Sequence, residues 1–166
     1  MLFNSDFFQL LYFCQIDLAF PLESYRWNLS PVCLPVAKVK DFSQLNRLVM
    51  TIGWGQMENG TESDELKRLP RTLLRNEVCR NSFEYSNDFV DKIMYCTSTA
   101  GKRDQCQGDS GSGWFTVDRR HRNGESKWHL IGLTSWGQGC GGHVGVGARL
   151  NDENLNWIKT IVSSNT

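Results

Sequence analysis

Asp104-Gln105-Cys106-Gln107-Gly108-Asp109-Ser110-Gly111 is the stretch that decides the fold of this chain. Its glycines let the backbone turn sharply beside Ser110, so that the N–H groups of Gly108 and Ser110 can point at one oxygen atom. A serine hydroxyl is a poor nucleophile at neutral pH and needs a base together with such donors. The tetrapeptide Gly-Asp-Ser-Gly also fits an ordinary turn, so the surrounding sequence has to decide between the two interpretations.

The sequence around this stretch has the pattern of an all-β protein. Short apolar runs alternate with clusters of Gly, Asn, Asp and Ser, and no internal repeat is present. Strands are predicted at 48–52, 128–134 and 144–150, and a short helix at 76–85. A second helix is predicted near the C-terminus, where acidic residues favour its positive end and one face carries Leu155, Ile158, Ile161 and Val162.

Length and composition narrow the class of protein. A chain of 166 residues with 40% hydrophobic residues fits one globular domain. Lysine plus arginine and aspartate plus glutamate number 18 each, so no net field favours a nucleic-acid partner. The densest basic patch, 119–122, is interpreted as a solvated loop. No stretch reaches a membrane-spanning length, and no cluster of residues indicates a metal or an organic cofactor.

The six cysteines indicate disulfides rather than a metal site. Their number is even and none of them has zinc-ligand spacing, which favours an oxidising compartment and a secreted protein. Two N-x-S/T sequons, at Asn28 and Asn59, are compatible with secretion. The apolar run 7–13 lacks a basic flank and a small-residue cleavage site. Residues 1–16 are therefore interpreted as an atypical N-terminal segment rather than a signal peptide.

Other short stretches of the sequence decide between the two interpretations of the tetrapeptide. In chain order they are Asp17-Leu18-Ala19, Val32-Cys33-Leu34-Pro35, Gly53-Trp54-Gly55, Met94-Tyr95-Cys96, the stretch 104–111, Ser135-Trp136-Gly137, Gly139-Cys140 and Trp157-Ile158. With this collinear set the chain resembles the chymotrypsin/trypsin family of serine proteases from about Asp17 to Val162. The resemblance implies an all-β, chymotrypsin-like antiparallel β-barrel, namely the second barrel plus part of the first, with a C-terminal helix packed on it.

The resemblance assigns a role to each residue of the site. Ser110 is expected to be the nucleophile, and Asp17 the buried carboxylate that orients and stabilises the catalytic histidine. The N–H groups of Gly108 and Ser110 are expected to form the oxyanion hole. Asp109 is expected to pair with the new N-terminal ammonium that forms when a zymogen is cleaved.

The same resemblance predicts a substrate pocket beside Ser110. Asp104 stands where trypsin-like members keep the acid at the pocket base, which implies cleavage after Arg or Lys in a protein or peptide substrate. Gln105 replaces a small residue and is expected to narrow the pocket. The residues that match the small pocket residues are Gly137 and Gly145. The strand edge expected to pair with the substrate backbone consists of Ser135, Trp136 and Gly137.

The resemblance also pairs four of the cysteines. It implies the disulfides Cys79–Cys96 and Cys106–Cys140. The second bridge is expected to tie the serine loop to the wall of the substrate pocket, which gives that disulfide a functional reason as well as a structural one.

The remaining cysteines and one missing disulfide are less regular. Cys33 matches the cysteine that usually tethers an activation or light chain, so a covalent partner chain is expected there. A Cys14–Cys33 bridge is an alternative that nothing in the sequence supports. Val49 and Thr116 stand at the two positions of a further disulfide that many family members have. The loss of both ends together is typical of a lineage that still folds.

The catalytic histidine is where the pattern fails. The family order is His, Asp, Ser, but all three histidines, His121, His129 and His143, follow Ser110. A late histidine also occurs in α/β-hydrolases, but Ser112 stands at the last position of their Gly-x-Ser-x-Gly motif and excludes that family. Two departures lie near the site: Ser112-Gly113 follows the serine-glycine pair, and Gly147 replaces a tyrosine of the pocket strand.

Two hypotheses follow for residues 1–166, taken as a partial trypsin-like protease domain. The first is a trypsin-like endopeptidase represented by a truncated chain, inactive by itself because it lacks the base. The second is a non-catalytic protease homologue that acts by protein binding, as a regulator or decoy. A purely structural barrel domain would leave the matches at Asp104 and Ser110 unexplained.

Overall fold

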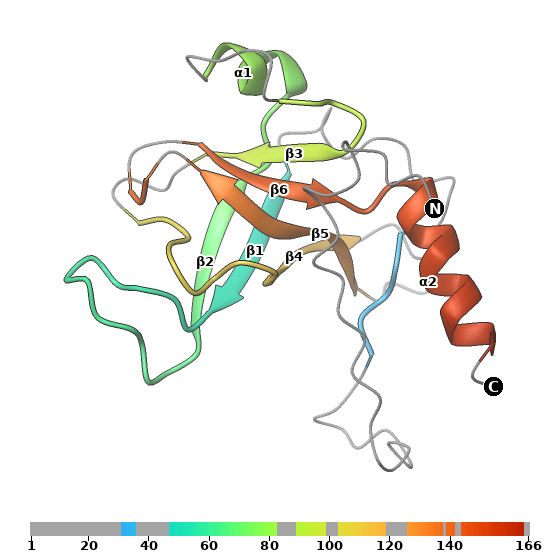
Figure 1. Cartoon of the computed structure of the whole chain (residues 1–166), viewed down its shortest axis with the longest axis horizontal. Coiled ribbons are helices and arrows are strands. Elements are labelled where there is room, and N and C mark those ends of the chain that lie inside the picture. Colours follow the sequence, from blue (N-terminus) through green and yellow to red (C-terminus); the bar gives the residue numbers. More distant parts are fainter. Residues whose placement is uncertain are drawn as a thin grey trace, which may run out of the picture.

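The fold is seen in a computed structural model, which describes residues 31–35, 47–82, 89–98, 103–118, 126–137, 139–141 and 144–164 (Figure 1). Antiparallel strands dominate this part of the chain. The strands are β1 (Leu48–Gly53), β2 (Lys67–Thr72), β3 (Met94–Thr97), β4 (Gly113–Asp118), β5 (Lys127–Gly137) and β6 (Gly145–Arg149), and the helices are α1 (Asn76–Asn81) and α2 (Asp152–Ser164).

The described strands form one six-stranded sheet in the order β2-β1-β4-β5-β6-β3. Every neighbouring pair in it is antiparallel. The two edge strands also meet, because Leu73, directly after β2, forms an antiparallel bridge with Thr97 at the end of β3. The sheet therefore curves into a half-barrel, with α2 beside one end of it (Figure 1). This architecture confirms the predicted all-β fold with a C-terminal helix.

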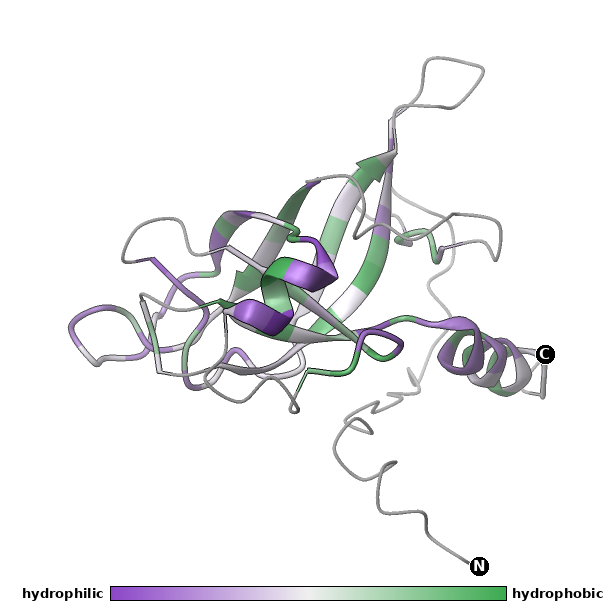
Figure 2. Cartoon of the chain, turned by 90° about the horizontal axis from the view of Figure 1, so that it is seen from above, coloured by the Kyte–Doolittle hydropathy of each residue, from purple (hydrophilic) through white to green (hydrophobic). Residues whose placement is uncertain are grey.

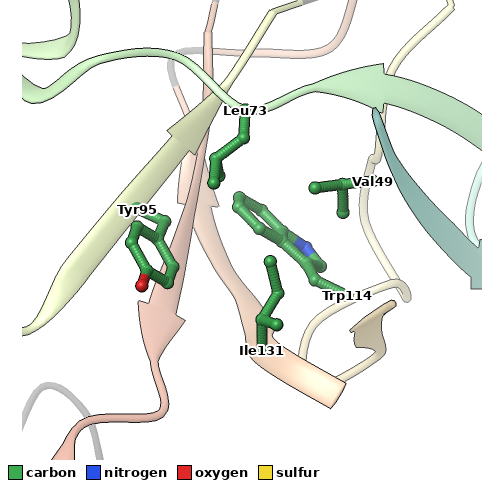
Figure 3. Packing of buried hydrophobic residues seen from close by; sticks show 5 residues of the cluster. All are labelled: Val49, Leu73, Tyr95, Trp114 and Ile131. Carbon is green, nitrogen blue, oxygen red and sulfur yellow. The ribbon is translucent and has the colours of Figure 1, made fainter. Parts of the chain in front are cut away.

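The inside of the half-barrel is filled by side chains from different strands (Figure 3). Val49, Leu73, Tyr95, Trp114 and Ile131 are each at most 2% exposed. Burial of a side chain of this size contributes about 1.5–3 kcal/mol relative to leaving it in water. Because these residues come from five different parts of the chain, the cluster holds the two edges of the sheet together.

A second buried cluster attaches α1 to the sheet. The disulfide between Cys79 of α1 and Cys96 of β3 lies within it. Phe89, Met94 and Val146 complete the cluster. The short helix has no side-chain cap at its N-terminus, so a covalent bond and apolar contacts to β3 and β6 supplement its own hydrogen bonds.

The predicted strands agree with the observed ones to within a few residues. Segment 48–52 lies in β1, 128–134 lies in β5, and 144–150 contains β6. The first helix is shorter than predicted, since α1 ends at Asn81, and residues 83–88 lie outside the described part of the chain. Figure 2 shows apolar colours concentrated along the strands and hydrophilic colours on the connecting loops and on much of α2.

The C-terminal helix begins with a reciprocal cap. Asn151 Oδ1 accepts the N–H of Asn154 at 2.9 Å, and Asn154 Oδ1 accepts the N–H of Asn151 at 3.4 Å. Leu155 is the buried anchor of the helix, at 3% exposed. Val162 does not belong to the covered face as predicted: it is 61% exposed, because α2 only borders the sheet and its last turn extends beyond it.

Candidate active site

The predicted serine turn is built by backbone hydrogen bonds. The N–H of Asp109 donates to Cys106 O at 3.0 Å, and the N–H of Ser112 donates to Asp109 O at 3.0 Å. Two further bonds join the turn to β5, from Gly111 N to Thr134 O and from Thr134 N to Ser112 O. Gly108 and Gly111 have φ values of 89° and 81°, in the left-handed region that favours glycine. These glycines make the tight reversal around Ser110 possible.

Ser110 lies exposed at the tip of this turn. Within the described residues its hydroxyl has no hydrogen-bond partner, and neither its N–H nor that of Gly108 donates to a protein acceptor. The two N–H groups predicted to form the oxyanion hole thus have no acceptor among the residues that the structure describes. A Cβ at Gly108 would lie 3.3 Å from Gly55 Cα, so this position also lies close to the neighbouring backbone.

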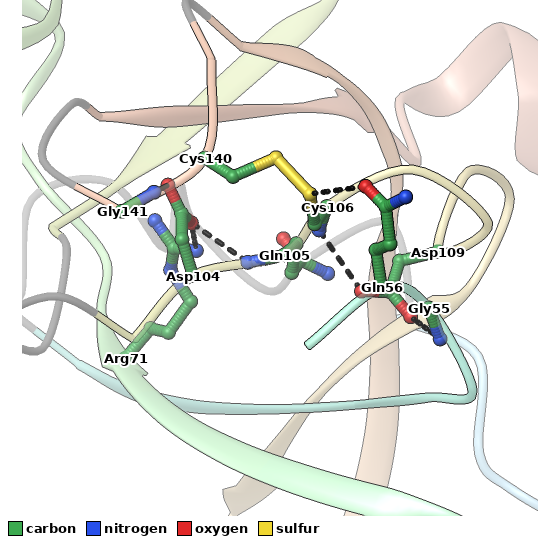
Figure 4. Close-up of a disulfide and its surroundings, with 9 residues drawn as sticks. All are labelled: Gly55, Gln56, Arg71, Asp104, Gln105, Cys106, Asp109, Cys140 and Gly141. Atoms are coloured by element: carbon green, nitrogen blue, oxygen red, sulfur yellow. Dashed lines mark hydrogen bonds and ion pairs between the residues drawn. A yellow bond between two sulfur atoms is a disulfide. The ribbon is translucent and has the colours of Figure 1, made fainter. Parts of the chain in front are cut away.

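The carboxylate of Asp109 points toward Gly55 (Figure 4). It accepts the N–H of Gly55 at 2.8 Å and the N–H of Cys106 at 3.0 Å. A Cβ on Gly53 or Gly55 would collide with this carboxylate, so the two glycines leave the room that it needs. Asp109 thereby ties the serine turn to the loop that follows β1. A cavity of about 320 Å³ adjoins it.

A second cavity lies beside Ser110. It has a volume of about 290 Å³ and is lined by Asp104, Gln105, Cys106, Gln107, Ser110, Thr134, Ser135, Trp136, Gly137, Gly139, Cys140 and Gly145. The disulfide Cys106–Cys140 joins two sides of this cavity, and the pairing is the one that the resemblance implies. Ser135 lies at a β-bulge, between the paired residues Thr134 and Trp136. All the residues predicted for the substrate pocket thus line one cavity.

Asp104, one of the residues that line this cavity, is paired with an arginine of the same chain (Figure 4). Arg71 Nη1 of β2 donates to Asp104 Oδ1, and the two side chains are 0% and 4% exposed. Asp104 Oδ1 also accepts the N–H of Gln105 at 2.8 Å, and Oδ2 accepts the N–H of Gly141 at 3.3 Å. The carboxylate therefore has three donors from the protein itself.

Thr134 connects several of the pocket residues through its hydroxyl. Trp114 Nε1 donates to Thr134 Oγ1 at 3.0 Å, and Gln105 Nε2 also donates to it. Ser112 Oγ lies 2.8 Å from the same oxygen. The Thr134 hydroxyl is thus the common partner of the indole, the Gln105 amide and the Ser112 hydroxyl. Ser112, a departure from the family pattern, thus belongs to the network behind the serine turn.

The predicted site residue Asp17 lies outside the described part of the chain, as do Cys14 and the histidines His121 and His143, which do not match the catalytic histidine. Of the three histidines only His129 is described; it is buried in β5, opposite Thr116, and does not line the cavity beside Ser110. Cys33 has a free thiol, and its alternative partner Cys14 lies outside the described residues.

Within the described residues no three metal-ligating side chains cluster. Neither helix of the described chain is long and apolar enough to cross a bilayer.

Arg71 is a residue of the described site that sequence reasoning missed. It stands in the run Lys67-Arg68-Leu69-Pro70-Arg71, where neighbouring basic residues suggest a solvated strand. Its only signal is the strand period, which places Leu69 and Arg71 on the same, partly buried face. The partner Asp104 lies 33 residues further along the chain and is brought near only by the closure of the half-barrel.

Comparison with known proteins extends these observations. The sequence model of the Trypsin family matches residues 18–158. The chain is 34% identical over 138 residues to Transmembrane protease serine 11B of Homo sapiens, a match covering 81% of this chain and 31% of that protein. It is 32% identical over 136 residues to Transmembrane protease serine 11G of Rattus norvegicus, covering 80% and 31%. The chain thus spans about a third of the length of these relatives.

The family match and the architecture agree. The matched residues include β1 to β6, the serine turn and both disulfides. The antiparallel half-barrel with its terminal helix is the chymotrypsin-like fold in part. The chain therefore belongs to the trypsin family of serine proteases and comprises part of its catalytic domain.

Proposed function

We propose that this chain is the nucleophile-bearing part of a trypsin-like serine endopeptidase that cleaves protein or peptide chains. The observation that carries the proposal is the exposed Ser110 beside two unbonded N–H groups, next to a cavity. In the proposed reaction Ser110 Oγ attacks the scissile carbonyl, and the N–H groups of Gly108 and Ser110 receive the oxyanion. The edge formed by Ser135, Trp136 and Gly137 pairs with the substrate backbone.

The base for Ser110 is proposed to be a histidine other than the three of these 166 residues. All three histidines follow Ser110, and His129, the described one, lies away from the cavity. Asp17 is proposed to orient that histidine. Without the base the hydroxyl is not activated, so the 166-residue chain by itself is expected to hydrolyse peptides very slowly.

Asp109 is proposed as the switch of a zymogen. Its carboxylate borders the cavity of about 320 Å³ that lies between the strands β1 and β2 and the stretch 103–109. A half-buried carboxylate with two N–H donors still has acceptor sites for an ammonium group. An N-terminus released by cleavage is proposed to enter there and fix the turn that carries Ser110.

The primary specificity depends on Asp104. Its place among the residues that line the cavity supports cleavage after arginine or lysine, as expected from the sequence. Its pairing with Arg71 opposes that specificity, because a substrate cation would have to compete with a cation of the chain itself. The specificity therefore depends on whether a substrate cation can displace Arg71 from Asp104.

An extracellular location is proposed for the domain. Two disulfides and the sequons at Asn28 and Asn59 favour an oxidising compartment. Cys33 has a free thiol and is partly exposed, so it is proposed to bind an activation chain through a disulfide. The relatives are named transmembrane proteases.

A second candidate function is that of a non-catalytic homologue that binds proteins. Two observations favour it: the sequence has no histidine before Ser110, and the acid of the pocket is already paired with Arg71. Such a protein would keep the half-barrel and its surface loops while losing hydrolysis.

Labelling with a serine-directed fluorophosphonate separates the two candidates. The protein isolated from its native source is treated with the reagent, and the labelled peptide is identified by mass spectrometry. Modification of Ser110 supports the endopeptidase, and its absence in folded protein supports the homologue. The recombinant 166-residue chain is the control and should remain unlabelled. Rapid labelling of that chain, abolished in Ser110→Ala, would contradict the proposal that the base comes from elsewhere.

A further inference from the structure

The pairing of Arg71 with Asp104 has the features of a built site. The guanidinium is held from three sides: Nε donates to Ser98 O at 3.0 Å, Nη2 donates to Thr97 O at 3.3 Å, and Nη1 donates to Asp104. The side chain is 0% exposed. A surface arginine that happens to contact an acid would not be fixed by two carbonyl groups as well. Arg71 is therefore positioned on Asp104 by the fold.

The carboxylate has little capacity left for a second cation. Each carboxylate oxygen offers about two acceptor sites. Oδ1 of Asp104 already accepts Arg71 Nη1 and the N–H of Gln105, and Oδ2 accepts the N–H of Gly141. A bidentate contact with a substrate guanidinium needs both oxygens, and one of them is already occupied. An approaching cation would also meet the charge of Arg71.

The space that a pocket glycine leaves open is filled as well. A Cβ on Gly145 would lie 3.0 Å from Arg71 Nη2 and 3.3 Å from Cζ. The guanidinium thus lies against the wall where a glycine, by the resemblance, makes room for a substrate side chain. The remaining cavity of about 290 Å³ opens on Ser110, Gln107 and Ser135.

We infer that Arg71 takes the place of a substrate cation at Asp104, so that the pocket beside Ser110 excludes arginine and lysine and accepts an uncharged side chain. Arg71 is then a specificity-determining residue. The exclusion of cations concerns binding alone, whereas the uncharged substrate side chain rests on the proposed endopeptidase function.

The test is equilibrium binding of p-aminobenzamidine, a fluorescent aromatic amidine, to the full chain. Binding breaks no bond in the ligand, so the result is independent of whether the protein is a catalyst. The wild type is expected to bind it no more tightly than about 1 mM. Arg71→Met exposes the Asp104 carboxylate and is expected to bind about 100-fold more tightly, as charge-assisted hydrogen bonds allow.

Three matched variants serve as controls for the binding experiment. Arg68→Met changes an exposed arginine of the same strand and should bind like the wild type. Arg71→Lys keeps the charge next to Asp104 and should also show no gain. Arg71→Met with Asp104→Asn should lose the gain, because the amide carries no charge. Tighter binding of the amidine by this double variant, or by Arg68→Met, than by the wild type would contradict the inference.

Binding of the amidine by the wild type tests the inference even if Arg71→Met does not fold. Micromolar binding of the amidine by the wild type overturns the inference, because Asp104 would then be available to a cation. If the fluorophosphonate does not label Ser110 in the native protein, the statement about an uncharged substrate side chain no longer holds. The statement that the pocket excludes cations is unaffected. If the native protein is active, peptides with an uncharged residue before the scissile bond should be cleaved faster than matched arginyl peptides.

Discussion

Trp114 on β4 and Gly147 on β6 share a single space in the core. A Cβ on Gly147 would lie 2.8 Å from Trp114 Cζ2 and 2.9 Å from Leu133 O. Trp114 is 0% exposed and stands in the centre of the cluster in Figure 3. The pocket strand of the family usually carries a tyrosine at the position of Gly147. Here the large ring comes from β4 instead, and the glycine is the complement that makes room for it.

Gly147→Ala is therefore expected to destabilise the fold. The added methyl group would push against the indole and a strand carbonyl, and overpacking of this kind costs about 1–3 kcal/mol. The sign of the change in unfolding free energy is informative, because alanine is otherwise more stable than glycine in a strand by about 0.5–1 kcal/mol. The free energy of unfolding in urea is the measurement. Gly137→Ala is the control, since the nearest atom to its added Cβ would be 3.7 Å away. Equal stability of the two variants would contradict the shared-space argument.

The ion pair of Arg71 and Asp104 should show strong coupling in stability. Asp104→Leu leaves a fully buried guanidinium without its anion, and breaking a buried pair in this way costs about 3–5 kcal/mol. Arg71→Met is expected to cost less, because the freed Asp104 lines a cavity that water can enter. The double variant should be more stable than Asp104→Leu alone. A double-mutant cycle from urea unfolding checks this, and additive losses would show that the two side chains do not depend on each other.

Local patterns in the sequence were enough to predict much of the fold and of the serine turn. β1, β5 and β6 follow from apolar runs closed by turn residues, and the glycines at 108 and 111 follow from the turn that Ser110 requires. Arg71 could not be predicted, because its burial depends on the meeting of β2 and β3 at the two edges of the sheet. The complementarity of Trp114 and Gly147 has the same origin, since two separate strands supply one packed volume. Properties that arise from closure of the barrel are invisible in local sequence.

The missing disulfide offers a test of the strand register. The pairs Met50–Phe115 and Thr51–Trp114 of β1 and β4 place Val49 opposite Thr116. Val49→Cys with Thr116→Cys is therefore expected to form a disulfide under oxidising conditions, and closure of a loop of this length stabilises the fold by up to about 4 kcal/mol. Thiol titration in denaturant and urea unfolding with and without reductant are the measurements. The single variant Val49→Cys is the control, and a persistent pair of extra free thiols in the double variant would show that the register is different.

The hydroxyl of Thr134 should matter more than its methyl group. Its Oγ1 accepts from Trp114 Nε1 and Gln105 Nε2 and lies within hydrogen-bond distance of Ser112 Oγ, so Thr134→Val removes the partner of three groups at once. The indole N–H is buried with its ring, and an unsatisfied buried donor costs about 1–3 kcal/mol. Thr134→Ser keeps the hydroxyl and should lose much less stability.

Since the backbone of Thr134 also forms two hydrogen bonds with the serine turn, Thr134→Val tests whether the side-chain network contributes to holding that turn beside those two bonds. Equal unfolding free energies for Thr134→Val and Thr134→Ser would assign the turn to the backbone bonds alone.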